Sequence, residues 1–206
     1  LLATMTVGVC YGQTGQVTHA IGMIDAIRRQ CLDTGDAGLA AHSGICIGAI
    51  LLDIGHVEDA LLHLAPAVKA AAKMQPDWIA IQGQLILAYA YYLSGKTDSS
   101  VGHIRRFYRL STLVDVSVRP WPYLMELAWA VETGLYPSCP EMSIRREVAS
   151  MLEGDNVFLK GVAYRFQALL QKKDGLPAQA VFDSLTHSSD CLETSGPAIE
   201  LAKTRL

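Results

Sequence analysis

The sequence lacks paired cysteines and an excess of one charge. Its 206 residues contain five cysteines, an odd number, and none of them forms a Cys-x-x-Cys pair. This pattern argues against a disulfide framework and against a thiolate zinc site. The formal net charge of −3 offers no concentrated positive field. We therefore expect no direct contact with nucleic acid and no binding to an anionic membrane.

Long hydrophobic segments are also missing. Apolar stretches such as 85–93 are too short to cross a bilayer, and the first residues do not have the layout of a signal peptide. We therefore expect no membrane insertion and a reducing, cytoplasmic location, in which Cys10 and Cys46 would be buried structural thiols. Because the sequence begins at Leu1 and stops at Leu206 within a helical pattern, we expect it to be a piece of a larger protein.

The motifs of catalysis and metal binding do not occur. The six histidines include no His-Glu-x-x-His pair, and neither a phosphate-binding Gly-x-x-x-x-Gly-Lys-Ser/Thr loop nor a Gly-x-Ser-x-Gly turn is present. His63 and His103 lie 40 residues apart, but two histidines without a third ligand make a poor metal site. Glu126 and Glu132 share one expected helix and have no defined catalytic partner. We expect no enzymatic activity, no cofactor and no metal.

What the sequence does contain is a repeat of 40 residues. A glycine that is followed five residues later by a small residue and then by an aliphatic one recurs at Gly15, Gly55, Gly95 and Gly175. The spacing is 40 from 15 to 55, 40 from 55 to 95, and 80 from 95 to 175, so one copy is degenerate. Its turn is expected near residue 135, from which the positions of the fourth copy are counted, and Gly134 lies there.

A small residue precedes each turn position by seven residues. Such a residue in a helix lets a neighbouring helix approach closely. The five copies carry Gly8, Gly48, Ala88, Ala128 and Ala168.

Each unit is therefore expected to form a helix, a glycine turn and a second helix, with apolar residues three and four positions apart. The first helices are predicted over 2–14, 40–54, 79–94, 123–133 and 157–173, and the second helices over 17–32, 57–74, 98–113, 141–152 and 178–193. The units span about 1–35, 36–76, 77–120, 121–155 and 156–195, with a partial unit over 196–206. The predicted fold class is all-α, an α-α superhelix of about five helical hairpins plus one terminal half-unit.

These features resemble the tetratricopeptide repeat family over nearly the whole chain. The matching residues are Gly8, Tyr11, Gly15, Ala20 and Ile21, then Gly48, Gly55, Ala60 and Leu61, then Ala88, Tyr91, Gly95 and Val101. The common family unit is shorter, roughly 34 residues. Long units of this kind are similar to those of bacterial signalling ATPases of the maltose-activator STAND type and of enhancer-binding transcription regulators. The resemblance implies a protein-interaction or ligand-sensing module for transcription regulation or signal transduction.

The resemblance also implies a concave groove, lined by residues ten, six and three positions before each turn glycine. The groove residues predicted in this way are Ile45, Leu85, Tyr89, Tyr92, Met125 and Trp129. The groove would be apolar with an aromatic centre, and so unlike the basic clamps that hold peptide tails. We expect a partner protein, an amphipathic helix or an apolar small-molecule effector to bind there.

Two alternatives to a groove that binds a partner or an effector stay open. A tight superhelix would bury these side chains as core, or a neighbouring domain or a second copy of the chain would fill the groove, giving a homodimer. The competing function is a passive scaffold or dimerisation element without a small-molecule ligand. Arg29, Lys69 and Arg109 recur at the repeat spacing on the second helices. We interpret them as a solvated face balanced by acidic residues elsewhere.

Overall fold

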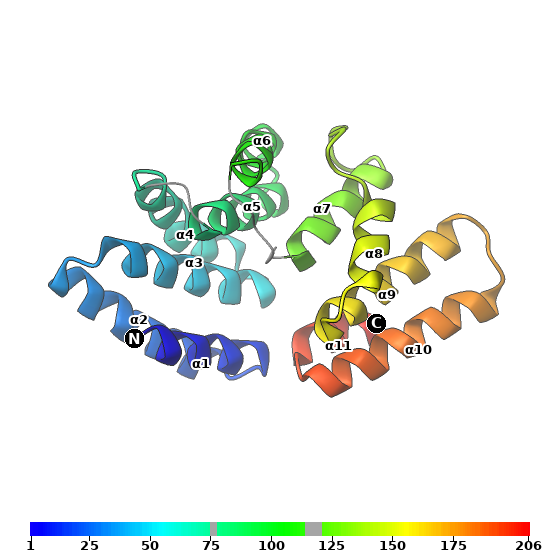
Figure 1. The fold of residues 1–206 in the computed structure, drawn as a ribbon, viewed down its shortest axis with the longest axis horizontal. Coiled ribbons are helices and arrows are strands. Elements are labelled where there is room, and N and C mark those ends of the chain that lie inside the picture. Colours follow the sequence, from blue (N-terminus) through cyan, green and yellow to red (C-terminus); the bar gives the residue numbers. More distant parts are fainter. Residues whose placement is uncertain (75–77, 114–120) are drawn as a thin grey trace. The chain divides into compact units, whose positions relative to one another are not determined.

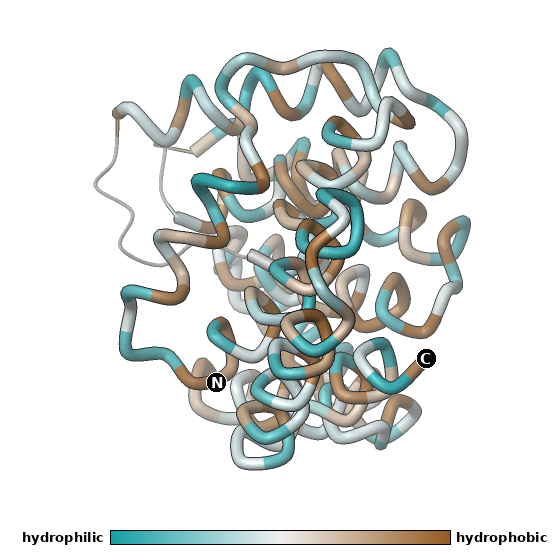
Figure 2. The backbone as a smooth tube through the Cα atoms, turned by 90° about the vertical axis from the view of Figure 1, so that its right-hand side faces the viewer, coloured by the Kyte–Doolittle hydropathy of each residue, from teal (hydrophilic) through white to brown (hydrophobic). Residues whose placement is uncertain are grey.

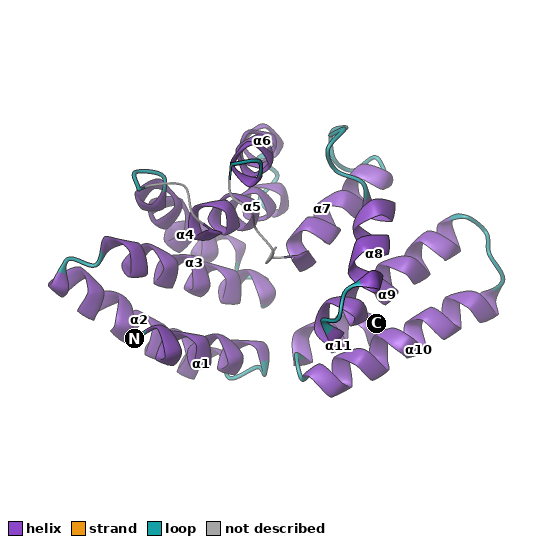
Figure 3. Ribbon diagram, viewed as in Figure 1, coloured by secondary structure: helices purple, strands orange, loops and turns teal. Residues whose placement is uncertain are grey.

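The computed structural model describes residues 1–74, 78–113 and 121–206 (Figure 1). Helices are the only regular elements in these ranges (Figure 3), which confirms the predicted all-α class. The helices pack in adjacent pairs along the chain. The chain divides into two compact units, residues 1–120 and 121–206, which we describe separately.

The helices of both units follow the expected order. Unit 1 contains α1 (Leu2–Gln13), α2 (Val17–Thr34), α3 (Ala37–Asp53), α4 (Val57–Ala71), α5 (Trp78–Leu93) and α6 (Thr97–Ser111). Unit 2 contains α7 (Trp121–Glu132), α8 (Ile144–Glu153), α9 (Val157–Lys173), α10 (Ala178–Ser195) and α11 (Ala198–Arg205). The observed ends lie within a few residues of the predicted ones. The unit boundaries expected near residues 76 and 120 lie outside the described residues.

Side-chain caps explain two starts that the hydrophobic pattern misplaced. The Asp36 carboxylate accepts a hydrogen bond from the Leu39 N–H at 3.0 Å, so α3 begins at Ala37 instead of 40. The Ser143 hydroxyl accepts one from the Arg146 N–H at 3.4 Å, so α8 begins at Ile144 instead of 141. Both caps satisfy a backbone donor that has no partner within its own helix.

The predicted glycine turns are confirmed, including the degenerate fourth copy. The glycines at 15, 55, 95, 134 and 175 all have positive φ, between 73° and 88°. The residue after each glycine donates its N–H to the carbonyl five positions earlier, as Leu135 does to Ala130 at 2.8 Å. This left-handed helix ending favours glycine because any Cβ would be strained there. It reverses the chain after each first helix.

The small residues seven positions before the turns are all buried, and they bring the two helices of a hairpin together. A Cβ added to Gly8 would lie 2.8 Å from Ile24 on α2, and one added to Gly48 would lie 2.4 Å from Leu64 on α4. In the third hairpin the Ser100 hydroxyl of α6 donates to the Ala88 carbonyl of α5 at 2.7 Å. The predicted close approach is therefore present in unit 1.

In unit 2 two helices also approach closely at a small residue, but this residue is Gly161 and not the one seven positions before the turn. Ala128 and Ala168 are each 1% exposed. A Cβ added to Gly161 on α9 would lie 2.7 Å from Leu192 on α10. Hydrophobic and hydrophilic residues are interspersed along the helices of both units (Figure 2). This pattern is typical of helices that have one buried face and one solvated face. No helix in the described part of the chain has the length and apolar character needed to span a membrane.

The close approach at Gly48 gives a first prediction. Gly48→Ala adds helix propensity worth up to about 1 kcal/mol, but overpacking of a core costs roughly 1–3 kcal/mol, so overpacking should dominate. The new methyl group would meet the fully buried Leu64 and approach the Ala60 carbonyl oxygen at 3.2 Å. We expect a net loss of about 1–2 kcal/mol in the free energy of unfolding, measured by urea titration of the helical circular dichroism signal.

Gly22→Ala is the matched control on α2. A Cβ at Gly22 would have no neighbour within 4 Å, so the change should raise the free energy of unfolding by about 0.5–1 kcal/mol. Equal effects of the two substitutions would contradict the close approach at Gly48.

Candidate functional site

Three of the predicted groove residues lie in the core instead. Ile45, Leu85 and Met125 are each 0% exposed, so a ligand cannot contact them in this structure. The reason is that the position ten residues before the turn faces a neighbouring first helix. The Ile45 side chain reaches α5, where a Cβ added to Gly83 would lie 2.8 Å from it. For these three residues the core interpretation applies.

The three aromatic residues of the predicted groove are half-buried. Tyr89 and Tyr92 lie one turn apart on α5, with ring centroids 6.4 Å apart. Trp129 belongs to unit 2, where its ring lies 6.5 Å from that of Phe166 on α9. Every residue six positions before a turn is half-buried in the same way: Val9, Ala49, Tyr89, Trp129 and Leu169. This position, and not the one ten residues before the turn, carries accessible apolar surface.

Trp129 lines a pocket of about 440 Å³ within unit 2. Apolar side chains form most of its wall, and α11 adds Lys203 and Thr204. The apolar part consists of Trp129 from α7, Phe166, Ala168 and Leu169 from α9, Val181 and Leu185 from α10, and Leu206 after α11. Lys172 stands at the edge of the pocket and is exposed. The size falls in the range of pockets that bind small molecules or a few side chains.

A buried ion cluster forms one side of this pocket. The Arg165 guanidinium donates to Glu200 at 2.7 Å and to Glu126 at 3.1 Å, and Lys203 donates to Glu200 at 2.6 Å. Arg165 also stands over the Phe166 ring, with 5.0 Å from Cζ to the ring centroid. Because Glu126 lies on α7, Arg165 on α9 and Glu200 on α11, the cluster joins three helices. Its charges neutralise one another.

Burial affects the two carboxylates differently. It raises the pKa of Glu126, and the nearby Arg165 opposes this only in part. Burial also acts to raise the pKa of Glu200, but Arg165 and Lys203 outweigh it, so that pKa is lowered. Two acids with opposed pKa shifts are a feature of acid-base pairs in enzymes. Here, however, both acids bind Arg165, which suits a structural link between helices.

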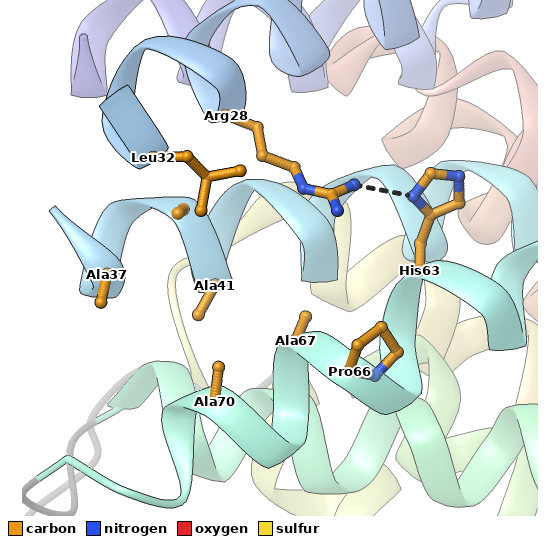
Figure 4. Close-up of a pocket in the computed structure, with 9 residues that line it drawn as sticks. Arg28, Leu32, Ala37, Ala41, His63, Pro66, Ala67 and Ala70 are labelled. Atoms are coloured by element: carbon orange, nitrogen blue, oxygen red, sulfur yellow. Dashed lines mark hydrogen bonds between the residues drawn. The ribbon is translucent and has the colours of Figure 1, made fainter. Parts of the chain in front are cut away.

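A second, smaller pocket of about 200 Å³ lies within unit 1, between α2, α3 and α4 (Figure 4). The Arg28 guanidinium lies at its edge, with Nη1 3.3 Å from Nδ1 of His63. Burial and the charge of Arg28 lower the pKa of His63, against the smaller opposing effect of Asp25 and Asp59. The imidazole is therefore neutral at pH 7 and accepts the hydrogen bond from Arg28. The rest of the wall is apolar.

The remaining candidates from the sequence have ordinary structural roles. His103 forms a hydrogen bond with Gln84 at 2.7 Å, so His63 and His103 have different partners. Within the described ranges no group of three or more His, Cys, Asp or Glu side chains is arranged for a metal ion. Cys46 is buried, which raises its pKa to about 12. The expectation that Cys10 is buried was wrong: it is exposed, since it lies on a face of α1 that α2 and α3 do not cover.

Two basic residues of the second helices pair with acidic residues, and Lys69 and Arg109, which share the register of Arg29, are exposed. Arg29 pairs with Asp25 at 2.7 Å, and Arg145 pairs with Asp174 at 2.8 Å. Arg145 and Lys173 also reach Glu132, at 3.3 and 2.7 Å. These contacts tie the ends of α7, α8 and α9 together at the surface.

The buried ion cluster was not predicted from the sequence, although the sequence contains a signal for it. The position ten residues before the turn carries Met5, Ile45, Leu85, Met125 and then Arg165. A charge in such a buried position requires partners, because an unpaired buried charge is strongly unfavourable. Glu126 on the preceding first helix and Glu200 on the following one were the available carboxylates.

The fold and the pockets define an all-α protein built of paired helices, with two pockets in the described residues that have distinct chemistry. A scan of protein-family models and a search of curated proteins found no match to this chain. Its relation to the tetratricopeptide repeat family therefore stays a prediction from the sequence.

Removing the central cation of the cluster should be strongly destabilising. Arg165→Met keeps much of the side-chain volume but leaves the buried Glu200 and the half-buried Glu126 without their shared partner. Breaking a buried pair in this way costs about 3–5 kcal/mol. Arg145→Met removes a charge of the same kind from the exposed pairs with Asp174 and Glu132 and should have a much smaller effect. Thermal and urea unfolding of both variants measures the difference, and similar losses would contradict the role of the cluster.

The opposed pKa shifts give a pH-dependent prediction. A lowered pKa means that ionised Glu200 stabilises the fold above its usual pKa of 4.5 and that this contribution is lost as the pH falls through the folded pKa. Glu200→Gln should therefore be destabilising at pH 7, and the difference from the natural chain should shrink on acidification. A raised pKa means that ionisation of Glu126 weakens the fold as the pH rises through that pKa. Glu126→Gln should thus lose little or no stability at pH 7.

Free energies of unfolding of both variants, measured from pH 7 downward through acidic pH, test the directions of both pKa shifts. Equal losses of stability in Glu200→Gln and Glu126→Gln at pH 7 would contradict the opposed pKa shifts of the two carboxylates.

Proposed function

We propose that this chain is a regulatory protein-interaction module, whose pocket beside Trp129 binds an amphipathic helix of a partner protein. The observation that carries the proposal is the apolar pocket of about 440 Å³ in unit 2, which has an aromatic side chain in its wall. The resemblance to long tetratricopeptide units favours a bacterial transcription regulator or signalling ATPase as the setting.

The chemistry of the pocket favours a particular kind of helix. Half-buried Leu169, Val181 and Leu185 offer apolar surface to side chains three or four positions apart on a partner helix. Lys172 is exposed at the edge and forms no ion pair with any described residue. An acidic residue on the polar side of the partner helix would complement it. The charges of Arg165 and Lys203 are already neutralised by Glu126 and Glu200.

The ion cluster would couple binding in the pocket to the arrangement of the helices. The pocket is lined by residues of α7, α9, α10 and α11, and Arg165 joins three of these helices. A partner that binds better to one arrangement of these helices shifts the population toward it. Such a partner would regulate whatever is attached to the array.

The competing function is a passive scaffold or dimerisation element. In that case the Trp129 pocket would be packing space without an occupant, and changes to its wall would alter stability alone. An apolar small-molecule effector is a further occupant that the pocket volume would admit.

Site-specific photo-cross-linking in cells of the source organism tests the proposal. A photoreactive amino acid at Leu169 should cross-link to one defined helical segment of a partner protein, because this side chain lines the pocket. The same amino acid at Phe182, which is 64% exposed on α10 and outside the pocket, is the control. Purified partner should then bind the natural chain at least about tenfold more tightly than the Leu185→Glu variant, because a buried carboxylate in an apolar pocket is unfavourable.

Different results identify the alternatives. Cross-linking at Phe182 but not at Leu169, or unchanged affinity of Leu185→Glu with unchanged melting, would contradict the proposed site. A cross-linked small molecule in place of a protein segment would favour the effector.

A further inference from the structure

The unit 1 pocket contains a cation without an acidic partner. Arg28 is half-buried, and its guanidinium forms a hydrogen bond with His63 but no ion pair with any described carboxylate. The nearest acidic residue along the helix, Asp25, is paired with Arg29 at 2.7 Å instead. A guanidinium has five N–H donors, so donors remain after the bond to His63. This positive charge is available to a bound anion.

His63 positions the guanidinium without neutralising it. The lowered pKa of His63 keeps the imidazole neutral, so its Nδ1 accepts the bond from Arg28 while Nε2 carries the proton. Arg28 comes from α2 and His63 from α4, so this bond fixes the guanidinium across two helices. A prearranged donor of this kind loses less conformational freedom on binding than a free surface arginine.

Beside the charge, the pocket is narrow and apolar. The methyl groups of Ala41, Ala67 and Ala70 point toward one another below Arg28, and Leu32 and Pro66 line the sides (Figure 4). The pocket persists because these side chains are small, while Gly44 and Ala67 hold α3 and α4 close together. A volume of about 200 Å³ is below that of most drug-sized sites and favours a small ligand.

We propose that the pocket between α2, α3 and α4 binds a small monocarboxylate with a short branched aliphatic chain. The Arg28 guanidinium would donate to the carboxylate, and the chain would occupy the space between the alanine methyl groups. Arginine and carboxylate match in geometry and form a charge-assisted pair that is stronger than a neutral hydrogen bond. This site lies in unit 1 and is independent of the Trp129 pocket and of the function proposed for it.

Titration of the natural chain with 3-methylbutanoate, followed by amide shifts in nuclear magnetic resonance, tests the proposal. A dissociation constant of about 1 mM or below is expected, with the shifts centred on the pocket. The neutral amide 3-methylbutanamide has the same shape and should bind at least about tenfold more weakly, because it lacks the charge. Acetate has the charge without the branched chain and should also bind more weakly.

Variants separate the pocket from general electrostatics. Arg28→Gln should weaken binding of 3-methylbutanoate about tenfold or more. Lys69→Gln also removes one positive charge, at an exposed position of α4 outside the pocket, and should leave binding unchanged. Ala37→Leu, at an exposed position of the pocket wall, should obstruct the aliphatic chain and weaken binding of 3-methylbutanoate more than that of acetate.

Three results would each overturn the proposal. They are the absence of shifts up to about 20 mM of 3-methylbutanoate, equal binding of the acid and its amide, and equal losses of binding in Arg28→Gln and Lys69→Gln. The comparison of acid and amide uses the natural chain, so it decides the question even if a variant does not fold.

Discussion

The close approach of paired helices at small residues is the constraint on which the rest of this structure depends. At Gly8, Gly48 and Gly161 an added Cβ would lie between 2.4 and 2.8 Å from a side chain of the partner helix. Such contact fixes the rotation of each first helix against its second helix. Once the rotation is fixed, the residue ten positions before the turn faces the core and the residue six positions before it lies at the edge. In unit 2 these positions carry Trp129, Arg165 and Leu169, which line the larger pocket.

The two pockets differ in how their charges are satisfied. In unit 2 the charges of Arg165 and Lys203 are consumed by Glu126 and Glu200, so the space beside Trp129 presents mainly apolar surface and suits an apolar segment. In unit 1 the guanidinium of Arg28 bonds to a neutral imidazole and pairs with no carboxylate among the described residues. Its positive charge therefore persists beside small apolar side chains and suits an anion with an aliphatic part. Similar helical hairpins therefore carry sites of different chemistry.

The helices and turns were predictable because their signals are local. Glycine at a left-handed helix ending and apolar residues at helical spacing act within a few residues, and even the degenerate turn at Gly134 was located. The candidate site was only partly predictable. Arg165 finds its acids 39 and 35 residues away, which depends on how neighbouring helices pack. Ile45, Leu85 and Met125 proved to be core, since periodicity alone does not distinguish a groove from an interface. The unit 1 pocket could not be predicted from the sequence, because the alanines that line it are equally typical of closely packed helices without a pocket.

The most direct test of this account is the measurement of nuclear Overhauser effects between the helix-contact glycines and the side chains that face them. We expect strong effects from the Gly8 α protons to Ile24, from those of Gly48 to Leu64 and from those of Gly161 to Leu192, because the paired helices are in close contact there. Absence of these effects in a folded, helical protein would contradict the close packing of the paired helices.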